Sequence, residues 1–245
     1  MIDANYNFNG KRAVLKKHKY AQIEAKMLKD LEPFINVPKV LEADKNRLII
    51  EYIENNTTFN EVTFGKELAK LHLNSSDYFG LNYDTTIGPL FQPNTQNKNW
   101  LEFFINERIL YMANMTYKEN QINTKLLNKI ELFCKKLDNL IPNNITPSLI
   151  HGDIWGGNLI SNNHKNYLID PVIYYAHNEM ELAFIKMFNT LSNEFFSSYR
   201  EIIKIDKEFF NYRYKIYQLY PYLVHIRIYG ASYIGGVEEI VDRFI

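Results

Sequence analysis

The first third of the chain alternates apolar and polar residues in a way that predicts a small sheet with one helix. Residues 6–8 and 12–16 have strand-like patterns, and Asn9-Gly10 between them supplies the positive φ angles of a two-residue hairpin turn. Apolar residues then recur at helical spacing from Ile23 until Pro33, which predicts a helix of about three turns. A further strand is expected over residues 47–53.

The pattern changes after residue 53. Glu54 to Thr58 contains no apolar residue, so we place a lobe boundary there, with a small N-terminal lobe over residues 1–56 and a large one over residues 57–245. Apolar residues of the second part recur at helical spacing, around 64–71, 101–109, 125–140, 179–191, 207–220 and 223–233. The large lobe is therefore expected to be mainly helical.

Composition excludes several classes of protein. The chain of 245 residues is 46% hydrophobic and 23% charged, which is typical of a folded globular protein. Lys plus Arg and Asp plus Glu are equal at 28 each, so no long-range field favours nucleic acid or an acidic membrane. No apolar run has the length of a membrane span, and the N-terminal residues lack a signal-peptide pattern, so we expect a cytoplasmic protein. Cys134 is the single cysteine, which rules out an internal disulfide.

The segment from Leu149 to Ile160 carries the clearest chemistry. Asp153 and Asn158 lie five residues apart in a glycine-rich turn, and Asp170 follows after a short apolar run. A phosphotransferase needs one carboxylate to orient and deprotonate the acceptor hydroxyl, and an amide oxygen and a second carboxylate to hold magnesium. Asp153 fits the role of the proton-accepting carboxylate, and Asn158 and Asp170 fit the roles of the two magnesium ligands. An aspartate in a turn is often only part of the turn, but strand-like runs on both sides favour the catalytic interpretation.

The same segment identifies a family. His151 to Asn158 resembles the HGDxWxGN signature of the fructosamine kinase (ketosamine kinase) family, a branch of the aminoglycoside-phosphotransferase-like, protein-kinase-like fold. Further similarities lie at residues 79–81, 100–108, 170–179 and 217–220. The resemblance implies an α+β fold with a small antiparallel sheet lobe that holds one helix and a large, mainly helical lobe.

The resemblance also implies a nucleotide site. Lys16 would pair with Glu24 and hold the phosphates, and Glu51-Tyr52-Ile53 would read the adenine edge through backbone groups. Spacing alone describes a solvated lysine and glutamate equally well, and strand alternation does not decide between Lys16 and Lys17. A plain core strand is the alternative for residues 51–53.

Substrate contacts are expected from two further places. The resemblance implies that Trp155 packs on the sugar, whereas packing in the protein core is the alternative. Tyr175, His177 and Glu179 lie where the family carries Y-G-x-R-E-x-D-L-A, and this chain departs from that pattern at positions 176, 178 and 181. Glu179 equally fits an acidic residue in the first turn of a helix.

The fold implied by the resemblance covers the nucleotide phosphates with a glycine-rich loop. Residues 2–6 look like the strand after that loop, and Gly10 belongs to the hairpin turn. We therefore expect the first strand and the glycine loop to be missing. The exposed edge left behind would suit a monomer or a homodimer paired along it.

These observations predict a kinase that uses ATP and Mg²⁺ to phosphorylate a hydroxyl of a sugar-amine, with a small molecule or a glycated amine as its partner. Neither nucleic acid nor a membrane is expected as a partner. Two alternatives remain open at this stage. One is a kinase-like protein with weak or no activity because the glycine loop is missing, and the other is a phosphotransferase for another small hydroxyl acceptor.

Overall fold

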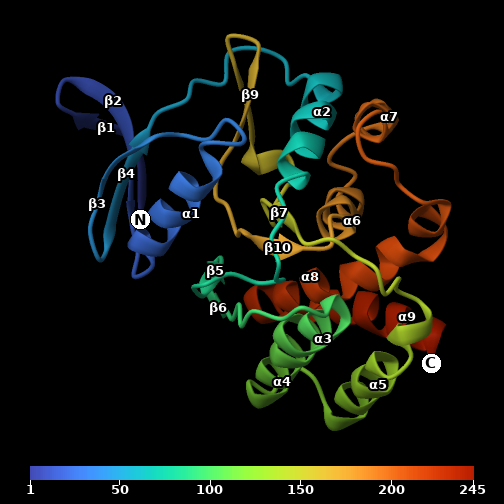
Figure 1. The fold of residues 1–245 in the computed structure, drawn as a ribbon. Coiled ribbons are helices and arrows are strands. Elements are labelled where there is room, and N and C mark those ends of the chain that lie inside the picture. Colours follow the sequence, from blue (N-terminus) through green and yellow to red (C-terminus); the bar gives the residue numbers. More distant parts are fainter. The chain divides into compact units, whose positions relative to one another are not determined.

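A computed structural model describes residues 1–245, which form two compact units. The first unit comprises Met1–Asn74, Ile150–Ile173 and Phe188–Lys204, and the second comprises Ser75–Leu149, Tyr174–Met187 and Ile205–Ile245. The fold is α+β, with a small antiparallel sheet and many helices (Figure 1). No helix combines the length and the apolar character that crossing a membrane requires. The lobe boundary after residue 56 stays a prediction.

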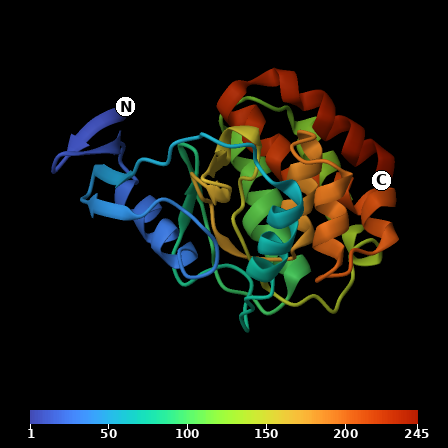
Figure 2. The ribbon, with the colours of Figure 1, turned by 90° about the horizontal axis from the view of Figure 1, so that it is seen from above.

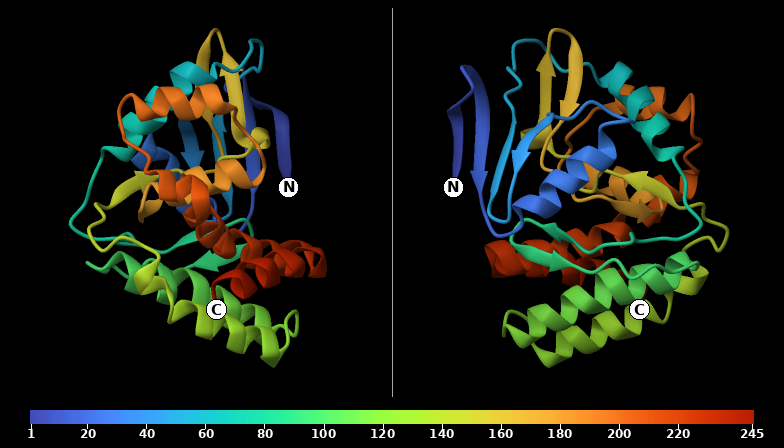
Figure 3. Two further views of the ribbon diagram at one scale, coloured as in Figure 1. Left: turned by 90° about the vertical axis from the view of Figure 1, so that its right-hand side faces the viewer. Right: turned by 60° about the vertical axis from the view of Figure 1, so that its left-hand side comes forward.

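The sheet of the first unit has four antiparallel strands in the order β1-β2-β4-β3. They are β1 (Ile2–Phe8), β2 (Lys11–Lys17), β3 (Val40–Ala43) and β4 (Arg47–Glu51). The β1–β2 turn has positive φ angles at both Asn9 (53°) and Gly10 (81°), which confirms the predicted hairpin. Helix α1 (Ala21–Leu31) packs on β3 and β4, and the chain leaves the helix before Pro33 as expected (Figure 3, right).

Helix α2 (Glu61–His72) begins where Asn60 caps it, with Oδ1 accepting from Thr63 N at 2.9 Å. It packs closely on α7 (Asn193–Arg200) in the same unit (Figure 2). A Cβ added at Gly65 would lie 2.1 Å from Ser198 Oγ and 2.6 Å from the Phe195 backbone oxygen. Glycine is therefore what allows these two helices to approach so closely.

Four short strands precede or follow the predicted catalytic segment in the chain. They are β7 (Ser148–Ile150), β8 (Leu159–Asn162), β9 (Lys165–Leu168) and β10 (Tyr174–Ala176). β8 and β9 form a hairpin that turns at Asn163 and His164, both with positive φ. Between β7 and β8, residues Gly156–Asn158 form a short 3₁₀ turn. The two strand-like runs expected beside the catalytic loop are thus present.

The second unit is mainly helical, with short strands β5 (Thr85–Ile87) and β6 (Leu90–Gln92). Its α-helices are α3 (Trp100–Phe103), α4 (Tyr111–Lys118), α5 (Thr124–Cys134), α6 (Glu179–Met187), α8 (Tyr214–Tyr229) and α9 (Ile234–Phe244). Two π-helical segments, Phe104–Leu110 and Phe209–Arg213, and 3₁₀ turns at Leu137–Asn139 and Ala231–Tyr233 complete it. Figure 3 shows α4 and α5 side by side.

The predicted break between residues 220 and 223 is wrong, because α8 runs through Pro221. Proline removes one helical N–H bond, but Leu219 and Leu223 on either side are fully buried, and their packing favours a continuous helix. The helix expected over 125–140 ends earlier, at Cys134. The pattern did not predict β3, α7 or α9.

Candidate active site

Asn158 orients Asp153 within the catalytic loop. Its Nδ2 donates to the backbone oxygen of Asp153 at 2.8 Å and to Asp153 Oδ2 at 2.9 Å. Asn158 is the buried end of a 3₁₀ turn, which places its amide against the carboxylate. Because the amide nitrogen is used as a donor, the amide oxygen is the atom of this side chain that a metal ion would take.

Backbone hydrogen bonds hold the Asp170 segment against the same loop. Ile169 N donates to Asn158 O at 3.2 Å, and Val172 N donates to His151 O at 2.8 Å. A Cβ added at Gly152 (φ +87°) would lie 2.4 Å from the oxygen of Val172, so glycine is required at this crossing. The structure thus brings the Asp153 loop and the backbone around Asp170 together.

His151 links the two segments through its ring. Its Nε2 lies 3.0 Å from the Ile169 carbonyl oxygen, and its Nδ1 accepts from Asp153 N at 3.3 Å. A carbonyl oxygen can only accept, so Nε2 carries the hydrogen and Nδ1 the lone pair. His151 therefore bonds to backbone groups on both sides, and the proton-accepting role of Asp153 stays a prediction.

Lys16 forms the ion pair that the resemblance implied. Its buried Nζ lies 2.6 Å from Glu24 Oε1 and also contacts Asp170 Oδ1. Burial by itself would lower the pKa of Lys16, but the carboxylates of Glu24 and Asp170 raise it overall. Lys17 on the same strand is exposed. Lys16, and not Lys17, therefore forms the ion pair with Glu24, and its role toward the phosphates stays a prediction.

Glu24 has a second neighbour that the sequence analysis did not include. His18 Nε2 lies 3.0 Å from Glu24 Oε2, on the opposite side of the carboxylate from Lys16. Burial would raise the pKa of Glu24, but the bond to His18 and the charge of Lys16 hold it below its usual value. The available signal was a histidine two residues after the lysine, in the turn before α1.

The expected adenine-reading segment follows the end of β4. Glu51 N donates to Lys39 O at 2.9 Å, so this N–H belongs to the sheet. The guanidinium of Arg12 lies 3.6 Å from the centre of the Tyr52 ring. Ile53 comes next in the chain and is half-buried. The nucleotide role of Glu51, Tyr52 and Ile53 stays a prediction.

A dense polar network, which we did not predict, ties residues 54–60 to the β8–β9 hairpin. Asn56 N and Thr57 N both donate to Ser161 O, at 3.0 and 3.2 Å. Asn60 and Asn166 exchange two bonds, N to Oδ1 at 3.1 Å and Nδ2 to O at 3.0 Å. Asn158 directly precedes β8, and Asp170 follows β9 by two residues. The network therefore connects the hairpin that carries both predicted metal ligands to the segment after β4.

The ring of Trp155 folds back onto the loop that carries it. The side chain is 46% exposed, so it is not part of the core. A Cβ added at Gly157 would lie 2.3 Å from the indole ring, which shows that the ring covers this glycine. The arrangement presents a large aromatic face two residues after Asp153 and leaves the sugar-packing role open as a prediction.

The other predicted substrate residues belong to the second unit. Tyr175 pairs through its backbone with Gly80, at 2.9 and 3.1 Å, and His177 Nδ1 lies 2.7 Å from the Tyr217 hydroxyl oxygen. Both carboxylate oxygens of Glu179 accept from Arg213, at 2.8 and 2.6 Å. Arg213 lies 34 positions away from Glu179, and no sequence pattern linked the two residues. Glu179 therefore has a buried structural partner, and its role toward substrate stays a prediction.

The protein oxygens at this site suit magnesium bound together with phosphates. The structure has no group of three His, Cys, Asp or Glu side chains that could cage a metal ion. Asn158 and Asp170 provide an amide oxygen and a carboxylate. Mg²⁺ commonly takes one or two protein oxygens and fills its octahedron with water and phosphate oxygens, so this donor set fits it.

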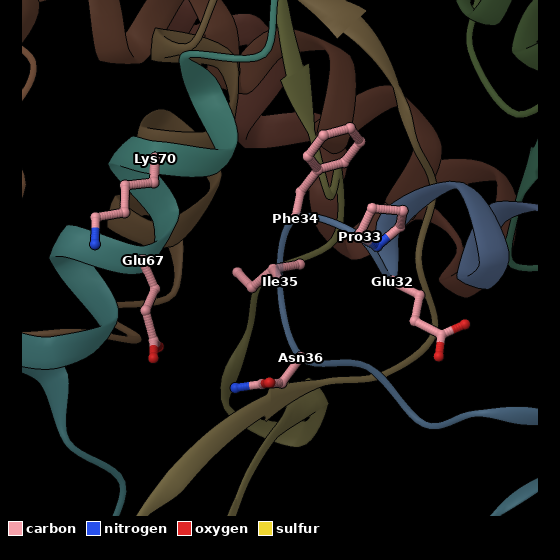
Figure 4. A pocket seen from close by; sticks show the side chains of 7 residues that line it. All are labelled: Glu32, Pro33, Phe34, Ile35, Asn36, Glu67 and Lys70. Carbon is pink, nitrogen blue, oxygen red and sulfur yellow. The ribbon is translucent and has the colours of Figure 1, made fainter.

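A separate hollow of about 270 Å³ lies in the first unit, between residues 32–36 and α2. Figure 4 shows Lys70 and Glu32 extending in different directions, so the charged groups at its rim do not converge. Glu67 there accepts from Asn166 Nδ2 at 3.2 Å, and burial raises its pKa. None of the predicted site residues lines this hollow.

Known proteins resemble this chain over most of its length. The family model described as fructosamine kinase matches residues 9–245. The ketosamine-3-kinase of Mus musculus is 35% identical over 180 residues, which is 73% of this chain and 58% of the mouse protein. This chain thus spans less than two thirds of that relative.

Solved structures show the same fold. A candidate fructosamine-3-kinase from Thermobifida fusca has 27% identity and a TM-score of 0.88, covering 96% of this chain and 85% of its own. An ADP-bound aminoglycoside phosphotransferase has 18% identity and a TM-score of 0.61, covering 94% of this chain and 85% of its own. The second likeness concerns the fold alone and identifies it as protein-kinase-like. The chain belongs to the fructosamine kinase family.

Proposed function

We propose that this chain uses ATP and Mg²⁺ to phosphorylate a hydroxyl of a sugar-amine of the fructosamine or ketosamine type. The observation that carries the proposal is the position of Asp153, whose carboxylate is held by Asn158 beside the backbone that leads to Asp170. These bonds support the assignment of Asp153 as proton acceptor and of Asn158 and Asp170 as metal ligands. Family membership supports the choice of a sugar-amine.

Asp153 orients the acceptor hydroxyl and accepts its proton late in a loose transition state. Its fixed direction matters more than its basicity there, because most of the bond to the leaving group has already broken. Asn158 Oδ1 and Asp170 would hold the metal ion, which neutralises charge on the phosphates when bound. Lys16 contacts Asp170 from β2 and would hold the phosphates.

Trp155 offers an aromatic face to the CH groups of the sugar, and Tyr175, His177 and Glu179 complete the substrate side of the assignment. The relative from Mus musculus is named a ketosamine-3-kinase, which supports a ketosamine as substrate. Asn178 replaces the family arginine, so a fixed fork of donors is absent at this position. The cytoplasmic location, the oligomeric state and the absence of nucleic-acid and membrane partners stay predictions.

The test is turnover against a panel of glycated amines. The purified chain is incubated with Mg²⁺-ATP and Amadori adducts of lysine with glucose and with ribose, and phosphorylated sugar is followed by ³¹P NMR alongside ADP release. The proposal expects a new phosphomonoester signal that Asp153→Asn abolishes. It also expects Asp170→Ala to shift the Mg²⁺ midpoint upward. ATP binding without any phosphorylated product would favour the kinase-like binding protein, and product with a simple polyol alone would favour another acceptor.

A further inference from the structure

The hollow between residues 32–36 and α2 has two hydrogen-bond acceptors on its wall that no protein group uses. Asn36 Nδ2 donates to the backbone oxygen of Asn166 at 3.0 Å, so the amide oxygen Oδ1 is the atom left without a partner. Glu67 Oε2 accepts from Asn166 Nδ2 at 3.2 Å, and no protein donor bonds to Glu67 Oε1. Both oxygens thus belong to side chains that line the hollow and are held by the same residue.

The rest of the wall is mainly apolar. It includes Pro33, Phe34 and Ile35, and Phe34 is 43% exposed although its side chain is large and apolar. Ligand pockets combine such apolar walls with a few polar groups, and the volume of about 270 Å³ suits a small ligand. A molecule with an apolar body and a hydrogen-bonding end therefore fits the hollow.

The charges of the wall favour a cation over an anion. Glu32 and Glu67 supply two carboxylates, whereas Lys70 supplies the single cation. Figure 4 shows the Lys70 side chain extending away from residues 32–36. Burial raises the pKa of Glu67, and the bond from Asn166 and the charge of Lys70 compensate only in part. A bound cation would stabilise the charged form of Glu67.

We propose that this hollow is a second binding site, which takes a small primary ammonium that carries an aryl or alkyl group. An ammonium has three donors and no acceptor, which matches a wall whose unused side-chain oxygens are acceptors. It donates to Glu67 Oε1, Asn36 Oδ1 is the second acceptor on the same wall, and the apolar group packs on Phe34. None of the predicted active-site residues lines the hollow, so this site does not depend on the proposed function.

Asn166 connects the hollow to β9. Its side chain is buried and bonds to Glu67, and its backbone oxygen accepts from Asn36. The backbone oxygen of Asn36 in turn accepts from Leu168 N at 3.0 Å, so Asn36 holds β9 at two points. A ligand that orders Glu67 and Asn36 should therefore slow hydrogen exchange at the Leu168 amide.

The test is an NMR titration of the full chain with 2-phenylethylammonium, compared with the neutral 2-phenylethanol and the anionic phenylacetate. The ammonium should bind saturably and the other two at least about tenfold more weakly, because a hydrogen bond to a charged group is lost. Glu67→Gln should weaken ammonium binding by a similar factor, and Phe34→Ala should also weaken it. Glu32→Gln is the matched control, since Glu32 also lines the hollow but extends in another direction (Figure 4). Lys70→Met should strengthen binding, because it removes a like charge.

Three results would overturn the proposal. Equal binding of the ammonium and the alcohol would show that no acceptor is used, and equal losses in Glu67→Gln and Glu32→Gln would reduce the effect to surface charge. Binding of phenylacetate that Lys70→Met abolishes would make the hollow an anion site. If Glu67→Gln does not fold, the comparison of ligands on the wild type and the exposed Phe34→Ala variant still decide. None of these measurements requires turnover.

Discussion

Asn158 holds Asp153 by two hydrogen bonds from a single nitrogen, one to the backbone oxygen at 2.8 Å and one to Oδ2 at 2.9 Å. The same residue that is proposed to offer its amide oxygen to a metal ion thus sets the direction of the expected proton acceptor. If the proposed roles hold, metal binding and hydroxyl orientation are coupled through this one side chain.

Asp153→Asn should leave the fold intact and lower kcat by about 10²- to 10⁴-fold, because it keeps the volume but removes the proton acceptor. The measurement is single-turnover phosphorylation together with the melting temperature. Wild-type turnover in a correctly folded variant would exclude Asp153 from this role.

Lys16→Met should weaken nucleotide binding and also destabilise the chain by about 3–5 kcal/mol, since it leaves two carboxylates without their shared cation. Lys17→Met on the exposed face of the same strand is the matched control and should change neither property. Urea unfolding and titration with Mg²⁺-ATP measure the two effects, and similar behaviour of both variants would show that Lys16 has no special function.

Lowering the pH should remove the contribution of Glu24 to the free energy of unfolding. Its pKa in the folded chain lies below the ordinary 4.5, so its contribution is present above that pH and is lost as the pH falls through the folded-state value. The difference in unfolding free energy between wild type and Glu24→Gln should therefore be largest near neutral pH and shrink below pH 4.5. A difference that does not vary with pH would contradict the depressed pKa.

Gly157→Ala should behave like Trp155→Ala in substrate binding. The added Cβ would lie 2.3 Å from the indole ring and must displace it, whereas a Cβ at Gly156 meets nothing within 4 Å. Both variants should raise the KM for the sugar-amine by about two- to a hundredfold without changing the KM for ATP, and Gly156→Ala should leave both constants unchanged. If all three variants lower only the melting temperature, the ring serves packing alone.

Arg213→Met should destabilise the chain by about 3–5 kcal/mol, because it leaves the buried carboxylate of Glu179 unpaired. Arg213 also approaches Asp206 at 3.7 Å, but that carboxylate is half exposed. Asp206→Asn is therefore the control and should cost less than about 1 kcal/mol in thermal unfolding. Comparable losses in the two variants would place the stabilising contact elsewhere.

Local patterns in the sequence predicted much of the fold. Turn chemistry and periodicity among neighbouring residues predict the Asn9-Gly10 hairpin, α1 and the strands beside the predicted catalytic loop. Pro221 shows the limit, since burial of its neighbours overrides a local helix breaker. The Glu179–Arg213 pair and the Asn60–Asn166 pair remained hidden because their partners are distant in sequence, and single residues of these types carry no pairing signal.

The bonds between residues 54–60 and the β8–β9 hairpin also bear on how the chain is made. Asn60 and Asn166 are 106 positions apart. During synthesis, more than a hundred further residues must therefore be added before the linker after β4 can bind its partners. The sheet and α1 can fold from nearby sequence, but the linker can dock only late, after the closure of a long loop. A fragment ending at residue 74 would leave the backbone N–H of Asn60 without its partner, Asn166 Oδ1. The first unit is thus completed by residues translated well after most of it.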